Sequence, residues 1–224
     1  MPPKMAAKTA AARPAAASEP GRDCPLCPRL VEFREEWRAN EPGWHNAPVP
    51  AFGPVDAPLL IVGLAPGLRG ANRTGRPFTG DYAGDLLYAT LIEYGFARGP
   101  YAAHPEDGLA LTGARIVNAV RCVPPQNKPT PEEIRTCRPF LSAAMAEMPA
   151  LRAIVTLGKI AHDSTLAALG QKASRLKFGH GVSDEVGSVR LFASYHCSRY
   201  NTNTGVLTPE MFRSVFSAVR ASLG

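Results

Sequence analysis

Two kinds of hydrophobic segment are missing from this sequence. No stretch comes near the roughly 20 consecutive apolar residues that a membrane-spanning helix needs, and the first residues lack the continuous apolar core of a secretory signal. We therefore expect a cytoplasmic protein with no membrane partner. Segment 1–22 contains no large apolar side chain apart from two methionines, so ordering it buries too little surface to offset the entropy cost. We expect 1–22 to be a flexible, Ala/Pro-rich, basic arm and 23–224 to form one domain.

A strong charge of either sign is also absent. The chain has 25 Lys and Arg against 19 Asp and Glu, a formal net charge of +6, and the arm carries part of that excess. A mildly basic domain suits a polyanionic partner without requiring one. The five cysteines are, in a reducing compartment, more often metal ligands, nucleophiles or core residues than disulfides.

Four short, β-branched apolar runs are typical of buried parallel strands, and they span residues 58–63, 115–120, 153–158 and 190–196. Helical patterns lie between and after them, at 84–95, 130–148, 159–170 and 208–224. This alternation predicts a single α/β domain with a central, mostly parallel, four-stranded sheet flanked by helices. Ligands of such sheets bind beyond the carboxyl ends of the strands. Here those ends carry a glycine-rich loop, Asn118, Gly158 and the segment 195–205.

The glycine-rich loop, GLAPGLRGANRTGRPFTGD at 63–81, lacks both common nucleotide-binding patterns. It has neither the G-x-G-x-x-G spacing nor the Gly-Lys-Ser/Thr ending of a P-loop. Around Phe78 it holds phosphate-type donors, namely Arg69, Asn72, Arg73, Thr74, Arg76 and Thr79. Donors around an aromatic ring suit a nucleic acid held by charge on its backbone and by stacking on a base. A connection without any site is the plain alternative.

Four of the cysteines form two spaced pairs. Cys24 and Cys27 make C-x2-C, and fourteen residues separate Cys122 from Cys137. Two such pairs favour a four-thiolate metal site over four unrelated thiols. The spacing suits zinc and an iron–sulfur cluster equally. A shared site would fasten the chain near residue 24 to the loop after the second strand.

Three segments together resemble the uracil-DNA glycosylase superfamily: the loop 63–81, VNAVRC at 117–122 and HCSRYNTNTG at 196–205. With the four cysteines, the pattern is most similar to family 5, the type B, iron–sulfur-containing enzymes. The resemblance covers residue 24 to about 222 and departs from the family pattern at Cys197, where proline or valine usually follows the histidine. It implies DNA as the partner of a monomeric protein, near the nucleoid of a prokaryote, and a structural 4Fe-4S cluster on Cys24, Cys27, Cys122 and Cys137.

The resemblance implies a pocket that receives a nucleotide flipped out of the DNA. Phe78 is then expected to stack on the base, and Asn118, whose amide both donates and accepts, to read its Watson–Crick edge. His196 is expected to donate to the base oxygen that gains negative charge as the glycosidic bond breaks. From the residues alone, Asn118 could equally cap a loop and His196 could be a buried hydrogen-bonded residue.

No carboxylate stands two positions after the first glycine of the loop, where other families of the superfamily place an acidic or amide residue. That position is Ala65, which we place in the substrate pocket. Because the sugar becomes oxocarbenium-like, a carboxylate that steadies it or activates water is expected. Asp81 is the matched carboxylate, and Asn72 is a second candidate for positioning the water. Asp85 could serve too, or either aspartate could be a charge at a helix N-terminus.

The residues after His196 correspond to the loop that wedges into the duplex where the base has left. We expect Tyr200 to fill the gap and Arg199 to bind phosphate; a solvated surface loop is the alternative. The full set of expected DNA contacts is Arg69, Arg73, Ser198, Arg199, Tyr200 and Asn201. The basic arm is expected to add salt-sensitive affinity.

We therefore expect a monofunctional DNA glycosylase of base excision repair, which hydrolyses the N-glycosidic bond of uracil in single- or double-stranded DNA and leaves an abasic site. The resemblance also implies activity on other deaminated bases, hypoxanthine above all. The alternative function is a non-catalytic, metal-stabilised nucleic-acid-binding module, which Ala65 favours. An electron carrier is disfavoured because nothing near the cysteines suggests a surface for a redox partner.

Overall fold

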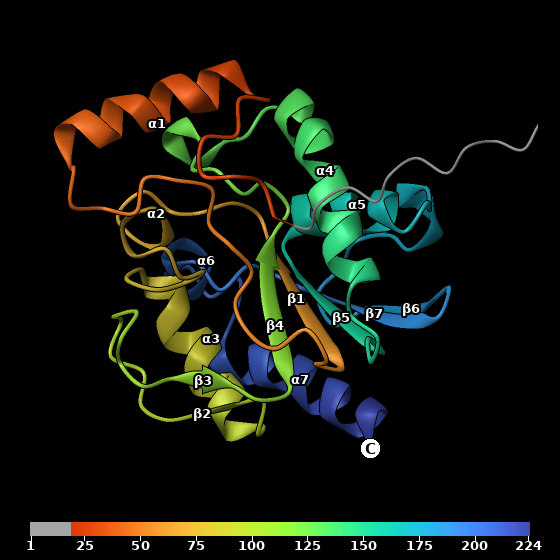
Figure 1. Ribbon diagram of the computed structural model, residues 1–224. Helices are drawn as coiled ribbons and strands as arrows, with labels where there is room; N and C mark the ends of the chain where they lie inside the picture. Colours follow the sequence, from red (N-terminus) through yellow and green to blue (C-terminus); the bar gives the residue numbers. More distant parts are fainter. Residues whose placement is uncertain (1–18) are drawn as a thin grey trace, which may run out of the picture.

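The computed structural model describes residues 19–224, so most of the expected arm lies outside the described residues. A five-stranded sheet with the order β4-β1-β5-β7-β6 carries the fold. Its parallel strands are β1 (Leu59–Gly63), β4 (Ala114–Asn118), β5 (Ala153–Leu157) and β7 (Val189–Ser194). The predicted fold class and all four predicted strands are confirmed, and the sheet lies at the centre of the molecule (Figure 1).

The predicted number of strands was one too low. The fifth strand, β6 (Ser183–Val186), pairs antiparallel with β7 at the edge of the sheet. Its sequence SDEV is polar and only Val186 is buried, so a search for apolar runs does not find it. A separate antiparallel pair, β2 (Ala97–Arg98) and β3 (Ala110–Leu111), was missed for a different reason: each strand has only two residues, too few to form a pattern.

Helices cover both faces of the sheet (Figure 1). They are α3 (Tyr82–Glu93) and α7 (Pro209–Leu223) on one face, and α4 (Pro131–Ala146) and α5 (Lys159–Ala168) on the other. Leu59 and Ile61 of β1 belong to the core under α3 and α7, whereas Leu60 and Val62 belong to the core under α4 and α5. A strand buried on both faces requires a continuous apolar run, which is why β1 is recognisable from its sequence.

The helix α1 (Pro28–Asn40) was not predicted. It buries only Leu30 and Arg34, so its apolar periodicity is weak. Leu30 packs with Val120 and Cys137 in a small third core, and α1 lies across the carboxyl-terminal end of the sheet (Figure 1). The remaining short helices are α2 (Ala71–Thr74), η1 (Pro125–Asn127), η2 (Ala173–Arg175) and α6 (Arg199–Asn203). Across residues 19–224, no helix has the length and apolar character to cross a membrane.

Candidate active site

A pocket of about 350 Å³ opens where the parallel strands end. In the order β4-β1-β5-β7, the chain leaves β1 to one side and returns on the other, the point at which open α/β sheets bind ligands. The pocket is lined by Leu64, Ala65, Pro66, Gly67, Ala71, Phe78, Asp81, Tyr82, Ala83, Asn118, Asn127, His196, Ser198 and Arg199. Seven of these were predicted as site residues, and they come from three segments far apart in the sequence.

Asn118 ends β4 directly beside Gly63, the last residue of β1. A Cβ at position 63 would lie 2.3 Å from Asn118 Oδ1 and 2.8 Å from Phe78 Cζ, so only glycine lets both side chains occupy this corner. Asn118 Oδ1 is buried and accepts no hydrogen bond from residues 19–224. A buried acceptor without a donor is costly, so this oxygen is suited to receive a donor from a ligand.

Phe78 is a buried pocket residue in an unusual backbone conformation. Its φ angle is +53°, in the left-handed region that bulky side chains rarely adopt. Its side chain is 6% exposed, and its ring is stacked near His196, with centroids 5.9 Å apart and planes inclined by 29°. A flat ligand in the pocket can therefore stack on the ring of Phe78, which its surroundings hold in place.

His196 lies just after β7 and lines the pocket, with its imidazole surrounded mainly by protein atoms rather than by solvent. Burial lowers the pKa of His196 to about 4, so the imidazole is neutral near neutral pH and can donate only from the one nitrogen that carries hydrogen. Its backbone carbonyl accepts a hydrogen bond of 2.8 Å from Asn201 Nδ2. Asn201, expected to touch DNA, thus supports the histidine loop from α6.

Asp81 lies at the N-terminus of α3 and lines the pocket. Burial raises the pKa of its carboxyl group, and its Oδ1 is buried and unpaired among the described residues. A Cβ at Gly70 would lie 2.4 Å from Asp81 Oδ2, so the glycine loop closes over the carboxylate. An acid held in this way is available to a sugar or a water in the pocket.

Asn72, the second candidate for positioning water, does not line the pocket. Its side chain is 1% exposed and donates to Asn46 Oδ1 at 2.9 Å. Arg76 and Thr79, read from sequence as phosphate donors, are also buried. Of these three, none is placed to reach a phosphate, so that interpretation of the loop was wrong for Asn72, Arg76 and Thr79.

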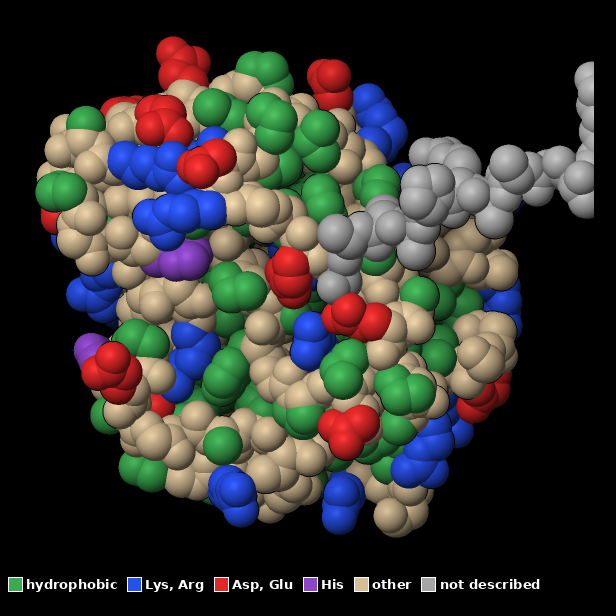
Figure 2. Space-filling model, in the orientation of Figure 1, with side chains coloured by type: hydrophobic (Ala, Val, Ile, Leu, Met, Phe, Trp, Pro, Cys, Tyr) green, Lys and Arg blue, Asp and Glu red, His purple; other side chains and the backbone are tan. Residues whose placement is uncertain are grey.

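Exposed cations and aromatics are found in the segments that line the pocket. Arg199 lies over the ring of Tyr82, with Cζ 5.2 Å from the ring centroid, and both line the opening. Tyr200 is 74% exposed, and Arg69 and Arg73 are exposed on the glycine loop. Ser198 caps α6, accepting from the backbone N–H of Asn201. On the face shown in Figure 2, basic and acidic side chains are interspersed, so the described charge does not form one continuous basic surface on that side.

Asn127 was missed by the sequence analysis although it lines the pocket. It ends the turn η1 with φ +57°, next to Gln126 at +55°. Arg29 of α1 holds this turn by donating to the carbonyl oxygen of Lys128 at 3.1 Å. The only local signal was the asparagine itself, a residue type that tolerates the left-handed region.

The four paired cysteines lie together around a second, small cavity between α1, the loop after β4 and α4. No three His, Cys, Asp or Glu side chains of residues 19–224 are grouped tightly enough to hold a single metal ion. Burial and the neighbouring thiols raise the pKa of Cys27 to about 11 and that of Cys122 to about 12. Cys197 lies apart, with its thiol donating to the carbonyl oxygen of Ala83 at 3.4 Å.

Arg121 is fully buried, lines this cavity and connects it to the start of the described chain. Its backbone N–H donates to Cys137 Sγ at 3.3 Å, and its guanidinium pairs with Glu19 at 3.2 Å. Glu19 also accepts from the backbone N–H of Ala51 at 3.0 Å. Glu19, which the sequence analysis assigned to the arm, is therefore attached to the folded domain.

Comparison with known proteins gives the class of this fold and pocket. The family model of the uracil DNA glycosylase superfamily matches residues 50–220. The chain is 47% identical over 208 residues to the type-5 uracil-DNA glycosylase of Thermus thermophilus, covering 90% of this chain and 94% of the relative. It is 44% identical to the type-5 enzyme of Mycobacterium tuberculosis (90% and 78% covered) and 38% identical to that of Pyrobaculum aerophilum (90% and 90% covered). The chain therefore belongs to the type-5 family of the uracil-DNA glycosylase superfamily.

Proposed function

We propose that this protein is a monofunctional DNA glycosylase that flips uracil out of DNA, hydrolyses its N-glycosidic bond and leaves an abasic site. The observation that carries the proposal is one 350 Å³ pocket in which Phe78, Asn118 and His196 lie together. Pockets of about 300–1,000 Å³ hold small ligands, so this one suits a single base with part of its sugar. Flipping a base out of the helix costs roughly a few kcal/mol. Stacking on Phe78 and hydrogen bonds to Asn118 offset that cost.

His196 stabilises the leaving base. As the glycosidic bond stretches, its electron pair moves onto the base and negative charge gathers on a ring carbonyl oxygen. A neutral imidazole donates a hydrogen bond to that oxygen without a proton being added first, which is stabilisation of the oxyanion-hole kind. The lowered pKa of His196 keeps the ring in that neutral form, and Asn201 holds its loop.

Asp81 acts on the sugar side. The sugar carries positive charge in the transition state, and a carboxylate nearby favours that charge and can accept a proton from the attacking water. Asp81 is the one predicted catalytic carboxylate that lines the pocket. Asn72 is assigned no part in positioning the water, because its amide is used by Asn46.

Asn118 selects the base. Its buried Oδ1 accepts the ring N–H that uracil presents and that cytosine lacks, while its Nδ2 can donate to a neighbouring base carbonyl. Hypoxanthine presents the same N–H next to a carbonyl, so excision of hypoxanthine is part of the proposal. Ala65 leaves the pocket without a polar side chain at its position, which lowers discrimination between such bases.

DNA is held at the mouth of the pocket. Arg199, with Arg69 and Arg73, binds phosphates, and the exposed Tyr200 enters the stack where the base has left. Asn127, which also lines the pocket, adds a further contact. The protein acts as a monomer in the cytoplasm, where the chromosome is reached.

The four cysteines fit a 4Fe-4S cluster. Cys24, Cys27, Cys122 and Cys137 line one small cavity, and four cysteine thiolates are the ligand set that such a cluster takes. When bound, the cluster supplies a crosslink between α1, the loop after β4 and α4, and no catalytic chemistry. Anaerobic purification should yield about four irons per chain; stoichiometric zinc in a colourless protein would contradict this assignment.

Excision from an oligonucleotide with one uracil, read as alkali-labile strand cleavage, tests the function. His196→Ala should bind the same DNA with nearly unchanged affinity and cut far more slowly, by about 10²- to 10³-fold. Arg175→Ala, at the exposed pair with Asp184, is the matched control and should cut normally. If the unaltered protein binds uracil-containing DNA but never releases base, the non-catalytic binding module is the correct function instead.

A further inference from the structure

We propose that a buried ion pair between Arg76 and Asp107, together with the hydroxyl group of Tyr101, positions the ring of Phe78 and so sets how closely the pocket fits a flipped base. The three are positioning residues, because none of them is among the residues that line the pocket. The inference rests on the proposed glycosylase function and deepens it.

Phe78 depends on its surroundings for its conformation. With φ at +53°, its backbone is in a region that costs a bulky residue free energy and persists only where neighbouring structure imposes it. From that backbone the ring reaches Gly63, where a Cβ would lie 2.8 Å from Phe78 Cζ. A relaxed, right-handed backbone at this residue would turn the ring away from the base site.

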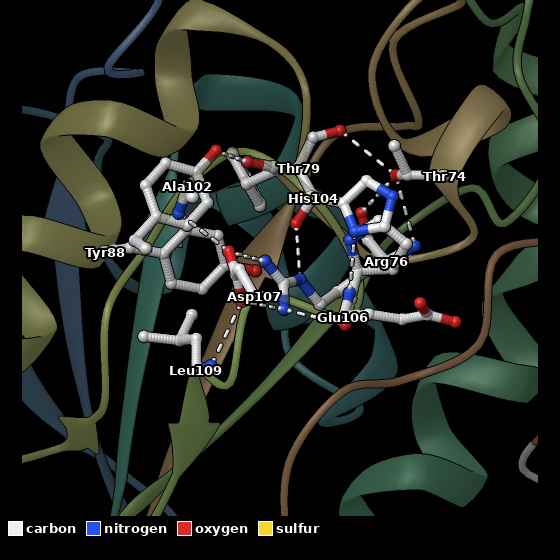
Figure 3. Close-up of polar contacts among 12 residues, drawn as sticks. Thr74, Arg76, Thr79, Tyr88, Ala102, His104, Glu106, Asp107 and Leu109 are labelled. Atoms are coloured by element: carbon white, nitrogen blue, oxygen red, sulfur yellow. Dashed lines mark hydrogen bonds and ion pairs between the residues drawn. The ribbon is translucent and has the colours of Figure 1, made fainter.

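The Arg76–Asp107 pair lies behind the loop that carries Phe78. Two guanidinium nitrogens of Arg76 donate to the two carboxylate oxygens at 2.9 and 2.8 Å, and Nε donates to Thr79 Oγ1 at 2.7 Å (Figure 3). The two charged side chains are only 6% and 1% exposed. The guanidinium also lies within 6 Å of the ring centroids of Phe52, Tyr88 and Tyr101. A bidentate pair fixes orientation as well as distance, so the backbone on both sides of Phe78 is held.

The same carboxylate folds the loop between β2 and β3. Asp107 accepts the backbone N–H of Ala102 at 2.9 Å and that of Leu109 at 3.0 Å, as Figure 3 shows. This loop carries Tyr101, whose hydroxyl group donates to the carbonyl oxygen of Phe78 at 3.1 Å. One buried carboxylate therefore controls two attachments to the Phe78 segment.

Two further contacts restrict the position of the Phe78 carbonyl group. The hydroxyl group of Tyr88 donates to the carbonyl oxygen of Pro77 at 2.5 Å. A Cβ at Gly84 would lie 1.9 Å from the Phe78 carbonyl oxygen and 2.3 Å from the Tyr101 hydroxyl oxygen. The carbonyl of Phe78 thus packs directly on the first turn of α3, the helix that Asp81 immediately precedes. A shift of the Phe78 ring and backbone would therefore also shift the start of α3 and, with it, Asp81.

The first test reads the position of the ring without any catalysis. The full-length protein, purified with its metal centre and labelled with fluorophenylalanine, gives one fluorine NMR signal for Phe78, assigned by its loss in Phe78→Leu. Asp107→Asn keeps the shape of the side chain but removes its charge. Tyr101→Phe removes one hydroxyl group and adds one labelled ring at position 101, whose extra signal is identified by its absence from every spectrum of protein that keeps Tyr101. Both should shift or broaden the Phe78 signal, whereas Asp184→Asn, the same change at the exposed Arg175–Asp184 pair, should leave it unchanged. An unshifted Phe78 signal in folded Asp107→Asn and Tyr101→Phe overturns the proposal.

The second test asks whether the effect on excision passes through Phe78. Because a misplacement of about 1 Å can cost about 10²-fold in rate, Asp107→Asn should slow single-turnover uracil excision by roughly 10- to 100-fold with little change in DNA affinity. In a Phe78→Leu background the same change should cost less than about threefold, since residues acting through one another are non-additive. Equal losses in both backgrounds would show a general loss of stability and refute the positioning role.

A third variant separates destabilisation from positioning. Val219→Ala removes buried atoms from the C-terminal part of α7. This part of α7 lies at the end of the sheet opposite the pocket, where Arg152, just before β5, donates to the carbonyl oxygen of Leu223. It should lower Tm while keeping both the uracil rate and the ratio of uracil to hypoxanthine rates. Asp107→Asn should change that ratio. If wild-type protein excises no base, the proposed function fails, while the fluorine signal still decides whether the ion pair positions Phe78.

Discussion

Replacing Asn118 by alanine should lower excision without lowering stability, which is the reverse of what most buried polar substitutions do. In the free protein Asn118 Oδ1 is buried and unpaired among residues 19–224, a condition that costs about 1–3 kcal/mol. Removing that oxygen removes the cost. Tm should therefore stay the same or rise, although the amide also leaves a small cavity.

The loss in excision follows from the bonds that the amide makes to a base. Two hydrogen bonds at about 1–1.5 kcal/mol each give about 2–3 kcal/mol, or roughly a 30- to 150-fold loss in kcat/KM. Single-turnover release of uracil, with DNA affinity and Tm measured on the same preparation, gives all three quantities.

Thr156→Val is the matched control. Thr156 is also a buried polar residue near the end of a parallel strand, but its hydroxyl group is satisfied by His162 and by the carbonyl oxygen of Phe192. It should lose stability and keep its excision rate. If Asn118→Ala instead loses stability and keeps its rate, the reading of the orphan oxygen as a base-binding group is refuted.

Four further outcomes follow from the same geometry. Burial lowers the pKa of His196 to about 4, from an ordinary value of 6.5. The pH profile of kcat/KM should therefore show no inflection from His196 near pH 6.5 and should fall only toward pH about 4. An inflection near pH 6.5 in the unaltered protein that is absent from His196→Gln would contradict this. Burial raises the pKa of Asp81 above its ordinary 3.8, so the charge destabilises the folded state as pH rises through the raised pKa. Asp81→Asn should therefore raise Tm near neutral pH, with the gain vanishing below pH about 4, and should slow excision; equal gains at both pH values would argue against a buried charge. Gly84→Ala, ordinarily stabilising within a helix by about 0.5–1 kcal/mol, should lower both Tm and the uracil rate because of the 1.9 Å approach to Phe78, and a rise in Tm would show that the carbonyl is free to move. Cys137→Ser should lose the metal centre and lower Tm, whereas Cys197→Ser should keep its iron. Iron retained in Cys137→Ser would remove Cys137 from the ligand set.

The sequence was informative where one physical requirement dominated. A strand buried on both faces needs a continuous apolar run, so β1, β4, β5 and β7 were recognisable. The helical patterns predicted from residues 130 and 208 correspond to α4 and α7, whose N-caps are Thr130 and Thr208. The polar edge strand β6 and the largely exposed α1 have no such requirement.

The candidate site divides in the same way. Residues at strand ends, such as Asn118 and His196, converge because parallel strands end together. The fate of individual donors on the glycine loop depended on partners far away: Arg76 is held by Asp107, 31 residues further along the chain, and Asn72 by Asn46. No local pattern records such partners, so Arg76 looked like a phosphate ligand and proved to be buried.

The most direct test of the central claim is to measure the free base and abasic sites produced from one oligonucleotide carrying a single uracil, using the full-length protein with its metal centre. The account predicts equal amounts of free uracil and alkali-labile sites, with the strand intact before alkali and no release from the thymine control. DNA that is bound with uracil still attached would contradict it.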